Sequence, residues 1–132
     1  MLMPRYFSRE EAEALLPQIS VLLRQIQQSH RELQQTEEGL HALRVKAKGN
    51  GHDLAERMMT LQKAVTAQRE QLSGLVGEVE AFGCELKDLP MGLIDFLSLR
   101  NGREIYLCWR LGEDRIRFWH YLDSGLASRQ PL

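Results

Sequence analysis

The sequence has few of the features that mark several large classes of protein. No window approaches the roughly 18 uninterrupted apolar residues of a membrane-spanning helix, and the first residues lack an apolar core of secretory length. The only two cysteines, Cys84 and Cys108, lie far apart in apolar surroundings, which favours free buried thiols over a disulfide. We therefore expect a cytoplasmic protein with no membrane association.

An excess of charge of one sign is also lacking. The 132 residues carry 17 basic and 18 acidic side chains, for a net charge of −1, and residues 1–82 and 83–132 are each close to neutral. Binding to nucleic acid or to an anionic membrane without sequence specificity requires a surplus of positive charge. The sequence thus predicts no nucleic-acid partner.

Signatures of catalysis are missing as well. Neither cysteine lies in an activating motif, and no glycine-rich elbow surrounds a serine. Gly49 and Gly51 lack the lysine, serine and preceding strand of a phosphate-binding loop. The sequence indicates no catalytic residue and favours a non-enzymatic protein over an enzyme.

The first half of the chain has the pattern of a long helix. Ser8 and Glu11 have the spacing of a capping box, so a helix should begin near Arg9, with a kink at Pro17. Apolar residues then follow in alternating steps of four and three, which is typical of a coiled coil. The positions are Leu15, Ile19, Leu22, Ile26, Ser29, Leu33, Thr36, Leu40 and Leu43, of which Ser29 and Thr36 are polar.

A second helix should follow after a short turn. Gly49-Asn50-Gly51 interrupts the pattern, Asp53 can cap a new helix, and the same spacing continues from Leu54 to Phe82. A loop this short makes the two helices antiparallel. Further apolar residues lie outside these coiled-coil positions (off-seam residues), among them Leu16, Val21 and Leu23. They predict that a sheet packs on the end of the hairpin away from the loop and leaves the other end as a projecting arm.

Beyond Gly83 the apolar period changes from 3.6 to 2, as in strands. Asn101-Gly102 predicts a tight hairpin because both residues accept a positive φ angle. Strands are expected over residues 93–99, 104–111 and 115–122, with a fourth edge strand over 84–88.

The expected fold is therefore α+β, a long antiparallel two-helix coiled-coil hairpin followed by a small three- to four-stranded antiparallel sheet. The length allows one domain, 1–132, with the hairpin in 9–82 and the β-sheet segment in 83–132. Strand alternation predicts one buried face and one face rich in arginine and aromatic side chains. The buried face should contain Ile105, Leu107, Trp109 and Leu111 with Ile116, Phe118, His120 and Leu122.

Four segments give the chain a resemblance to a known family. They are YFSREEAEALLP, ELKDLPMGLIDF, NGREIYLCWRLGE and FWHYLDSGLASRQPL. Together they resemble a bacterial family known only as domain of unknown function two-two-zero-three, over nearly the whole chain. The resemblance implies a prokaryotic cytoplasmic protein of one domain, and it supplies no activity, substrate or catalytic residue.

One pair of residues suits a metal. His120 and Asp123 form a His-x-x-Asp pair at the end of the third expected strand, and Glu104 or Cys108 of the neighbouring strand could approach them. Imidazole and carboxylate suit zinc or another divalent metal, which needs three or four protein ligands. The competing interpretation is a hydrogen-bonded core histidine, because alternation places His120 on the apolar face. No other cofactor is predicted.

Arginine and aromatic side chains on the opposite face suggest a second kind of site. Glu104, Arg110, Arg117 and Trp119 could form a shallow pocket for an anion or a planar ligand, because guanidinium groups stack on rings and pair with carboxylates. Two alternatives remain. The arginines could pair with acidic residues across the hairpin, or this face could meet another copy of the chain.

Two functions are compatible with these patterns. The first is an interaction or scaffold protein that forms a homodimer or higher oligomer through its helical arms, or binds another protein, and buries Val45 and Met59. The second is a domain that binds a metal or small molecule at the sheet, with the coiled coil serving only to dimerise it. The sequence favours the first.

Overall fold

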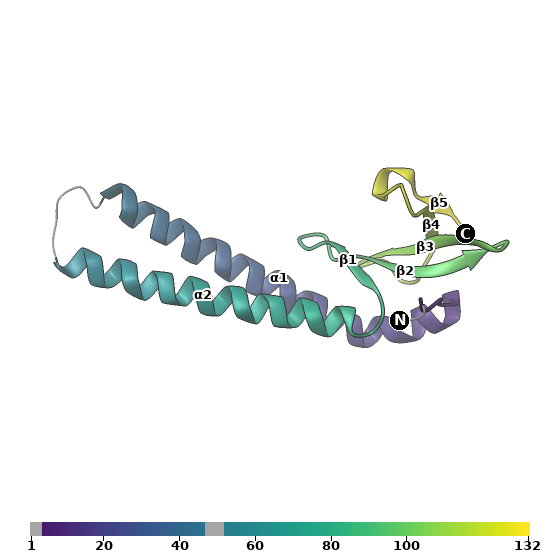
Figure 1. Cartoon of the computed structure of the whole chain (residues 1–132), viewed down its shortest axis with the longest axis horizontal. Coiled ribbons are helices and arrows are strands. Elements are labelled where there is room, and N and C mark those ends of the chain that lie inside the picture. Colours follow the sequence, from purple (N-terminus) through teal and green to yellow (C-terminus); the bar gives the residue numbers. More distant parts are fainter. Residues whose placement is uncertain (1–3, 47–51) are drawn as a thin grey trace.

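The computed structural model describes residues 4–46 and 52–132 and consists of a long helical hairpin followed by a small sheet (Figure 1). The hairpin contains α1 (Arg9–Lys46) and α2 (His52–Glu80). The antiparallel sheet contains β1 (Glu85–Asp88), β2 (Leu93–Arg100), β3 (Arg103–Arg110), β4 (Phe118–Tyr121) and β5 (Gln130–Pro131), with the 3-10 helix η1 (Leu126–Ser128) before β5. The predicted α+β fold, two packed helices and then an antiparallel sheet, is confirmed.

The capping box starts α1 as the sequence predicts. The backbone N–H of Glu11 donates to Ser8 Oγ at 3.0 Å, and the backbone N–H of Ser8 donates to Glu11 Oε1 at 2.9 Å. The helix continues through Pro17 for 38 residues, which corresponds to about 57 Å. α2 begins at His52, one residue before the predicted cap Asp53. The predicted turn at 49–51 lies outside the described residues.

The sheet has the order β1-β2-β3-β4-β5, so each strand pairs with its neighbours in sequence. Asn101 and Gly102 have φ angles of 52° and 78°, which confirms the tight hairpin between β2 and β3. The third expected strand is shorter than predicted, because only Phe118–Tyr121 pairs with β3. The prediction missed β5, a strand of two residues.

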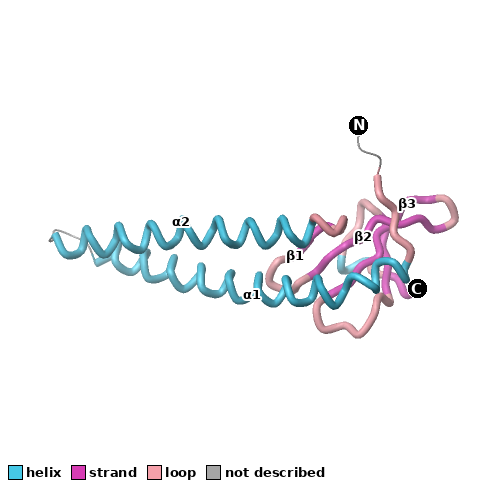
Figure 2. The backbone as a smooth tube through the Cα atoms, turned by 90° about the horizontal axis from the view of Figure 1, so that it is seen from below, coloured by secondary structure: helices cyan, strands magenta, loops and turns pink. Residues whose placement is uncertain are grey.

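The core lies where the sheet covers the N-terminal part of α1, while the rest of the hairpin extends away from the sheet (Figures 1 and 2). Leu16 and Leu23, two of the off-seam residues, are buried there, whereas Val21 is 54% exposed. The buried apolar side chains of this core are Phe7, Ala12, Leu16, Ile19, Leu23, Ile26, Val79, Cys84, Ile94, Phe96, Ile105, Leu107, Trp109, Ile116 and Trp119.

Residues 4–8 run beside β2 and attach the start of α1 to the sheet. The backbone N–H of Phe7 donates to the carbonyl of Leu97 at 2.8 Å, and Ser98 Oγ donates to the carbonyl of Phe7 at 2.6 Å. The Phe7 ring packs edge-on against Phe96, with the ring centres 5.1 Å apart. The Phe7 ring also accounts for the glycine at position 83. Gly83 has a φ of +104°, and an added Cβ would lie 2.7 Å from Phe7 Cζ, so there is no room for a side chain.

The register of β4 corrects the predicted faces of the sheet. His120 pairs with Tyr106 and Trp119 pairs with Leu107, so Trp119 faces the helices and His120 lies on the other face. The prediction was wrong because it extended strand alternation back to Ile116, whereas the backbone is irregular between β3 and Phe118. Ile116 is buried in the core although His120, four residues later, points away from it.

None of the helices in residues 4–46 and 52–132 is both long and apolar enough to cross a membrane.

Candidate functional site

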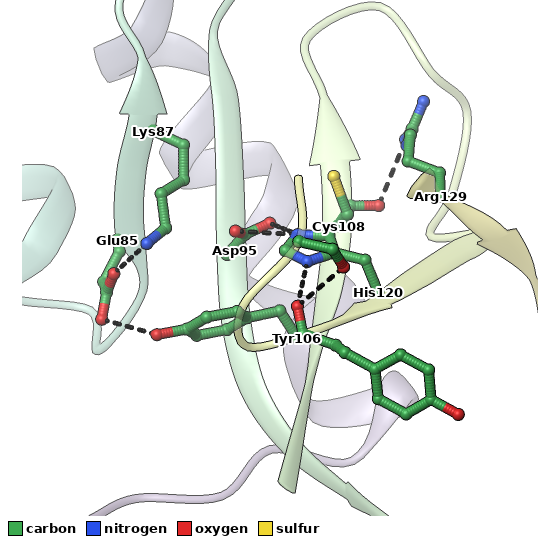
Figure 3. A network of polar contacts seen from close by, with 9 residues as sticks. Glu85, Lys87, Asp95, Tyr106, Cys108, His120 and Arg129 are labelled. Atoms are coloured by element: carbon green, nitrogen blue, oxygen red, sulfur yellow. Dashed lines mark hydrogen bonds and ion pairs between the residues drawn. The ribbon is translucent and has the colours of Figure 1, made fainter. Parts of the chain in front are cut away.

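The face of the sheet away from the helices holds a buried polar cluster formed by Asp95, Cys108 and His120. Asp95 and Cys108 are paired residues on β2 and β3, and His120 projects from β4 on the same face. Their exposed fractions are 2%, 0% and 2%. Figure 3 shows the side chains of Asp95 and His120 facing each other, with Cys108 next to them and Arg129 to one side.

The imidazole of His120 is held on both sides. Its Nε2 lies 3.0 Å from each carboxylate oxygen of Asp95, and its Nδ1 lies 2.8 Å from the carbonyl oxygen of Tyr121. A carbonyl can only accept, so Nδ1 carries a hydrogen and donates it. The backbone N–H and the hydroxyl of Ser124 donate to the same carbonyl, each at 3.1 Å, which fixes its position.

One more proton must lie between His120 and Asp95. Their facing atoms would otherwise be an imidazole lone pair and a carboxylate, which repel each other. The pair is therefore either an imidazolium with a carboxylate or an imidazole with a carboxylic acid. Burial raises the pKa of Asp95 above its ordinary value, and the charge of His120 opposes that rise.

Cys108 is a neutral thiol at neutral pH. Burial is the main cause that raises its pKa to about 12, and the negative charge of Asp95 adds to the effect. A thiol with this pKa is a poor nucleophile at neutral pH, so the geometry gives no support for cysteine catalysis.

Charged residues surround the cluster in pairs. Arg129 donates to the carbonyl oxygen of Cys108 at 3.3 Å and to Glu113 Oε1 at 2.7 Å. On the other side, Lys87 lies 2.6 Å from Glu85, which accepts a hydrogen bond from Tyr106 at 3.1 Å. The Tyr106 ring in turn packs on His120, with the ring centres 5.5 Å apart (Figure 3).

The structure places the two predicted metal ligands differently. His120 lies in the buried cluster, but Asp123 is exposed beyond the end of β4. Asp95 was not identified from the sequence, although one carboxylate within the apolar run Leu93–Arg100 is an unusual feature that could have drawn attention to it. Cys108, named as a residue that could approach His120, does so.

The four residues of the predicted ligand pocket do not gather in one place. Trp119 faces the helices. Glu104 and Arg110 lie on the other face, because strand alternation along β3 places them on the same side as Cys108. Glu104 accepts a hydrogen bond from Tyr6 at 2.9 Å. Arg117 makes two hydrogen bonds of 3.0 Å with Asp114, which is the charge pairing considered as the alternative.

A second region without an obvious partner is the arm, defined as residues 31–46 of α1 with residues 52–72 of α2. The described side chains buried in it form one small cluster of Leu33, Leu40 and Val65. An open groove of about 550 Å³ runs between the helices and is lined by Gly39, Ala42, Leu43, Lys46, Glu56, Arg57, Thr60 and Leu61. Another groove between them is polar, and there Arg69 pairs with Glu37 at 2.6 Å.

The family model of an uncharacterized conserved protein, DUF2203, matches residues 5–132, so the chain belongs to this family. Comparison with curated proteins and with solved structures found no match.

Proposed function

We propose that this DUF2203 family member is a non-enzymatic scaffold protein that pairs with a second copy through the arm. The observation that carries the proposal is the small amount of core in the arm. Two helices extend beyond the sheet around three buried apolar side chains, whereas most helix stability in proteins comes from burial against other elements. A second hairpin would complete a four-helix arrangement.

The groove lined by Ala42 and Leu61 is the centre of the proposed contact. Gly39 has no side chain and Ala42 has only a methyl group, so a helix of the second copy can approach closely. Leu43 and Leu61 offer half-buried apolar surface. Val45 and Met59, which are 61% and 56% exposed, add apolar surface elsewhere on the arm. The burial of this surface would favour association.

The charge of the arm is compatible with self-pairing. Its described residues contain six basic and six acidic side chains. Two copies can therefore approach without net repulsion, and opposite charges along the helices can pair in an antiparallel arrangement. A partner of strong single-sign charge would gain nothing from such a surface.

Two alanine positions provide a matched test. Ala42 is an exposed alanine that lines the groove, and Ala67 is an exposed alanine on α2 outside that groove. We expect the wild-type protein and Ala67→Glu to be dimers by sedimentation velocity, and Ala42→Glu to be a monomer with unchanged helix content. A charged side chain placed in the groove would bury an unpaired carboxylate on association.

Two outcomes would overturn this proposal. A wild-type chain that stays monomeric at high concentration excludes self-association. Dissociation of Ala67→Glu with an intact Ala42→Glu dimer places the interface on another face of the arm.

A further inference from the structure

Three potential metal ligands converge on the outer face of the sheet from three adjacent strands. The ligand atoms of Asp95, Cys108 and His120 all lie within 4.8 Å of one another, and among the described residues no other group of three His, Cys, Asp or Glu side chains meets this distance. All three side chains are buried, so thermal motion of long surface chains does not account for their approach.

The second observation is the orientation of His120. The hydrogen bond from Nδ1 to the carbonyl of Tyr121 fixes the ring so that Nε2 points at Asp95. In metalloproteins the histidine ligand is held in the same way, with the nitrogen that does not bind the metal donating to a carbonyl or carboxylate. The tautomer and the direction required of a ligand are therefore already set by this chain.

The distance between His120 and Asp95 would change little if an ion were bound between them. Ligands about 2.0–2.1 Å from a tetrahedral zinc ion lie about 3.3 Å from each other. His120 Nε2 is 3.0 Å from both oxygens of Asp95, so an ion would lengthen that contact by only a few tenths of an ångström. The three ligand atoms lie within 4.8 Å of one another, and binding requires the sulfur of Cys108 to lie about 3.5 Å from the other two, the spacing that follows from the bond of about 2.3 Å between zinc and thiolate.

We propose that Asp95, Cys108 and His120 bind one divalent ion of the zinc class. Thiolate and imidazole select zinc or cobalt over magnesium and calcium, which prefer oxygen ligands. The ion replaces two protons, one shared by His120 and Asp95 and one from the thiol of Cys108, and both are released to water. Three protein ligands leave the fourth position of the ion for a water or another small donor.

This exchange leaves the buried charge unchanged. With the two protons the cluster has no net charge, and with one divalent ion, a carboxylate, a thiolate and a neutral imidazole it again has none. The nearby cations do not oppose the ion with uncompensated charge, because Arg129 is paired with Glu113 and Lys87 with Glu85. Burial of an uncompensated charge would otherwise be very costly.

Cobalt(II) provides the probe, because a thiolate ligand gives it a charge-transfer band in the near ultraviolet. The full chain is unfolded with chelator, then refolded with zinc or cobalt as the only metal. We expect one ion per chain by native mass spectrometry, the thiolate band with cobalt, and a higher melting temperature with zinc than without.

Cys84 supplies the matched control, since it is the other cysteine and is also buried, at 3% exposure. Cys84→Ser should keep the band and the zinc-dependent shift in melting temperature, and Cys108→Ser should lose both. Asp123→Asn should bind like the wild type, because Asp123 is exposed outside the cluster.

The proposal is overturned if the refolded wild type binds neither ion stoichiometrically, which would leave His120 and Asp95 as a structural hydrogen-bonded pair. It is equally overturned if Cys84→Ser loses the band as Cys108→Ser does. The wild-type result decides even if a variant fails to fold. Because the cluster and the arm share no residue, the oligomeric state is a separate readout.

Discussion

The end of the helical hairpin that packs on the sheet, here called the sheet end, and the arm are built from the same two helices. They differ in what covers them. At the sheet end, α1 packs in one cluster with apolar residues of the segment before it, of α2 and of the sheet, and fifteen buried apolar side chains form this cluster. In the arm, the buried apolar cluster of the described residues joins α1 to α2 and has three members. The same helical spacing therefore gives different amounts of burial depending on whether a third layer is present.

The first prediction tests this difference within one helix. Leu23 at the sheet end is 0% exposed, and Leu40 in the arm is 6% exposed. We expect Leu23→Ala to lower the free energy of unfolding by about 3–5 kcal/mol and Leu40→Ala by about 2 kcal/mol, because the thinner arm can collapse around a deleted side chain. Urea unfolding at one protein concentration measures both. Equal losses would mean that the arm is as well packed as the sheet end.

Two glycines give effects of opposite sign. Gly83→Ala should lower the free energy of unfolding by about 1–3 kcal/mol through its positive φ and the contact with Phe7. In the unassociated chain, Gly39→Ala should raise it by about 0.5–1 kcal/mol, since alanine favours the helix and the added Cβ would meet Leu61 Cδ1 at 3.9 Å, an ordinary contact. Thermal unfolding provides the comparison, and a destabilised Gly39→Ala would show that the arm is already tightly packed.

The third effect appears only at high pH and concerns the sheet end, because both cysteines lie there. Burial raises the pKa of Cys84 and of Cys108 to about 12, compared with about 8.5 in an unfolded chain. The folded state then binds more protons than the unfolded state between these values. Each thiol should therefore make the protein less stable by about 1.4 kcal/mol for every pH unit above about 8.5.

Cys84→Ser isolates that contribution. Its free energy of unfolding between pH 9 and 10 should fall less steeply than that of the wild type, by the share of one thiol. Identical slopes would show that the Cys84 thiol does not govern this pH range.

The sequence predicted those parts of the fold that depend on local patterns. The helix start at Arg9 follows from Ser8 and Glu11, and the β2–β3 hairpin follows from Asn101 and Gly102, because neighbouring residues determine both structures. The position of the sheet, at the end of the hairpin away from the loop, was also predictable from Leu16 and Leu23. These signals all lie within a few residues of the feature they specify.

The missed features depend on contacts between distant segments. Residues 4–8 pair with β2 over about ninety positions of sequence, and β5 is too short to show any alternation. The face of His120 depends on the register that an irregular connection gives to β4, and no periodicity encodes it. The approach of Asp95 to His120 follows from that register, so the sequence alone suggested Asp123 instead.

The pairing of residues 4–8 with one side of β2 and of Gln130–Pro131 with β4 has a consequence for behaviour at high concentration. Open sheet edges invite strands of other molecules and lead to fibrous aggregates, and native proteins prevent this with short, proline-containing or covered borders. Here one border carries Pro131, which offers no N–H to a further strand. The other border is the four-residue strand β1, which pairs only with the start of β2, and the segment before α1 bonds to β2 at Leu97 beyond the end of β1. Borders of this kind disfavour strand-to-strand aggregation of the sheet.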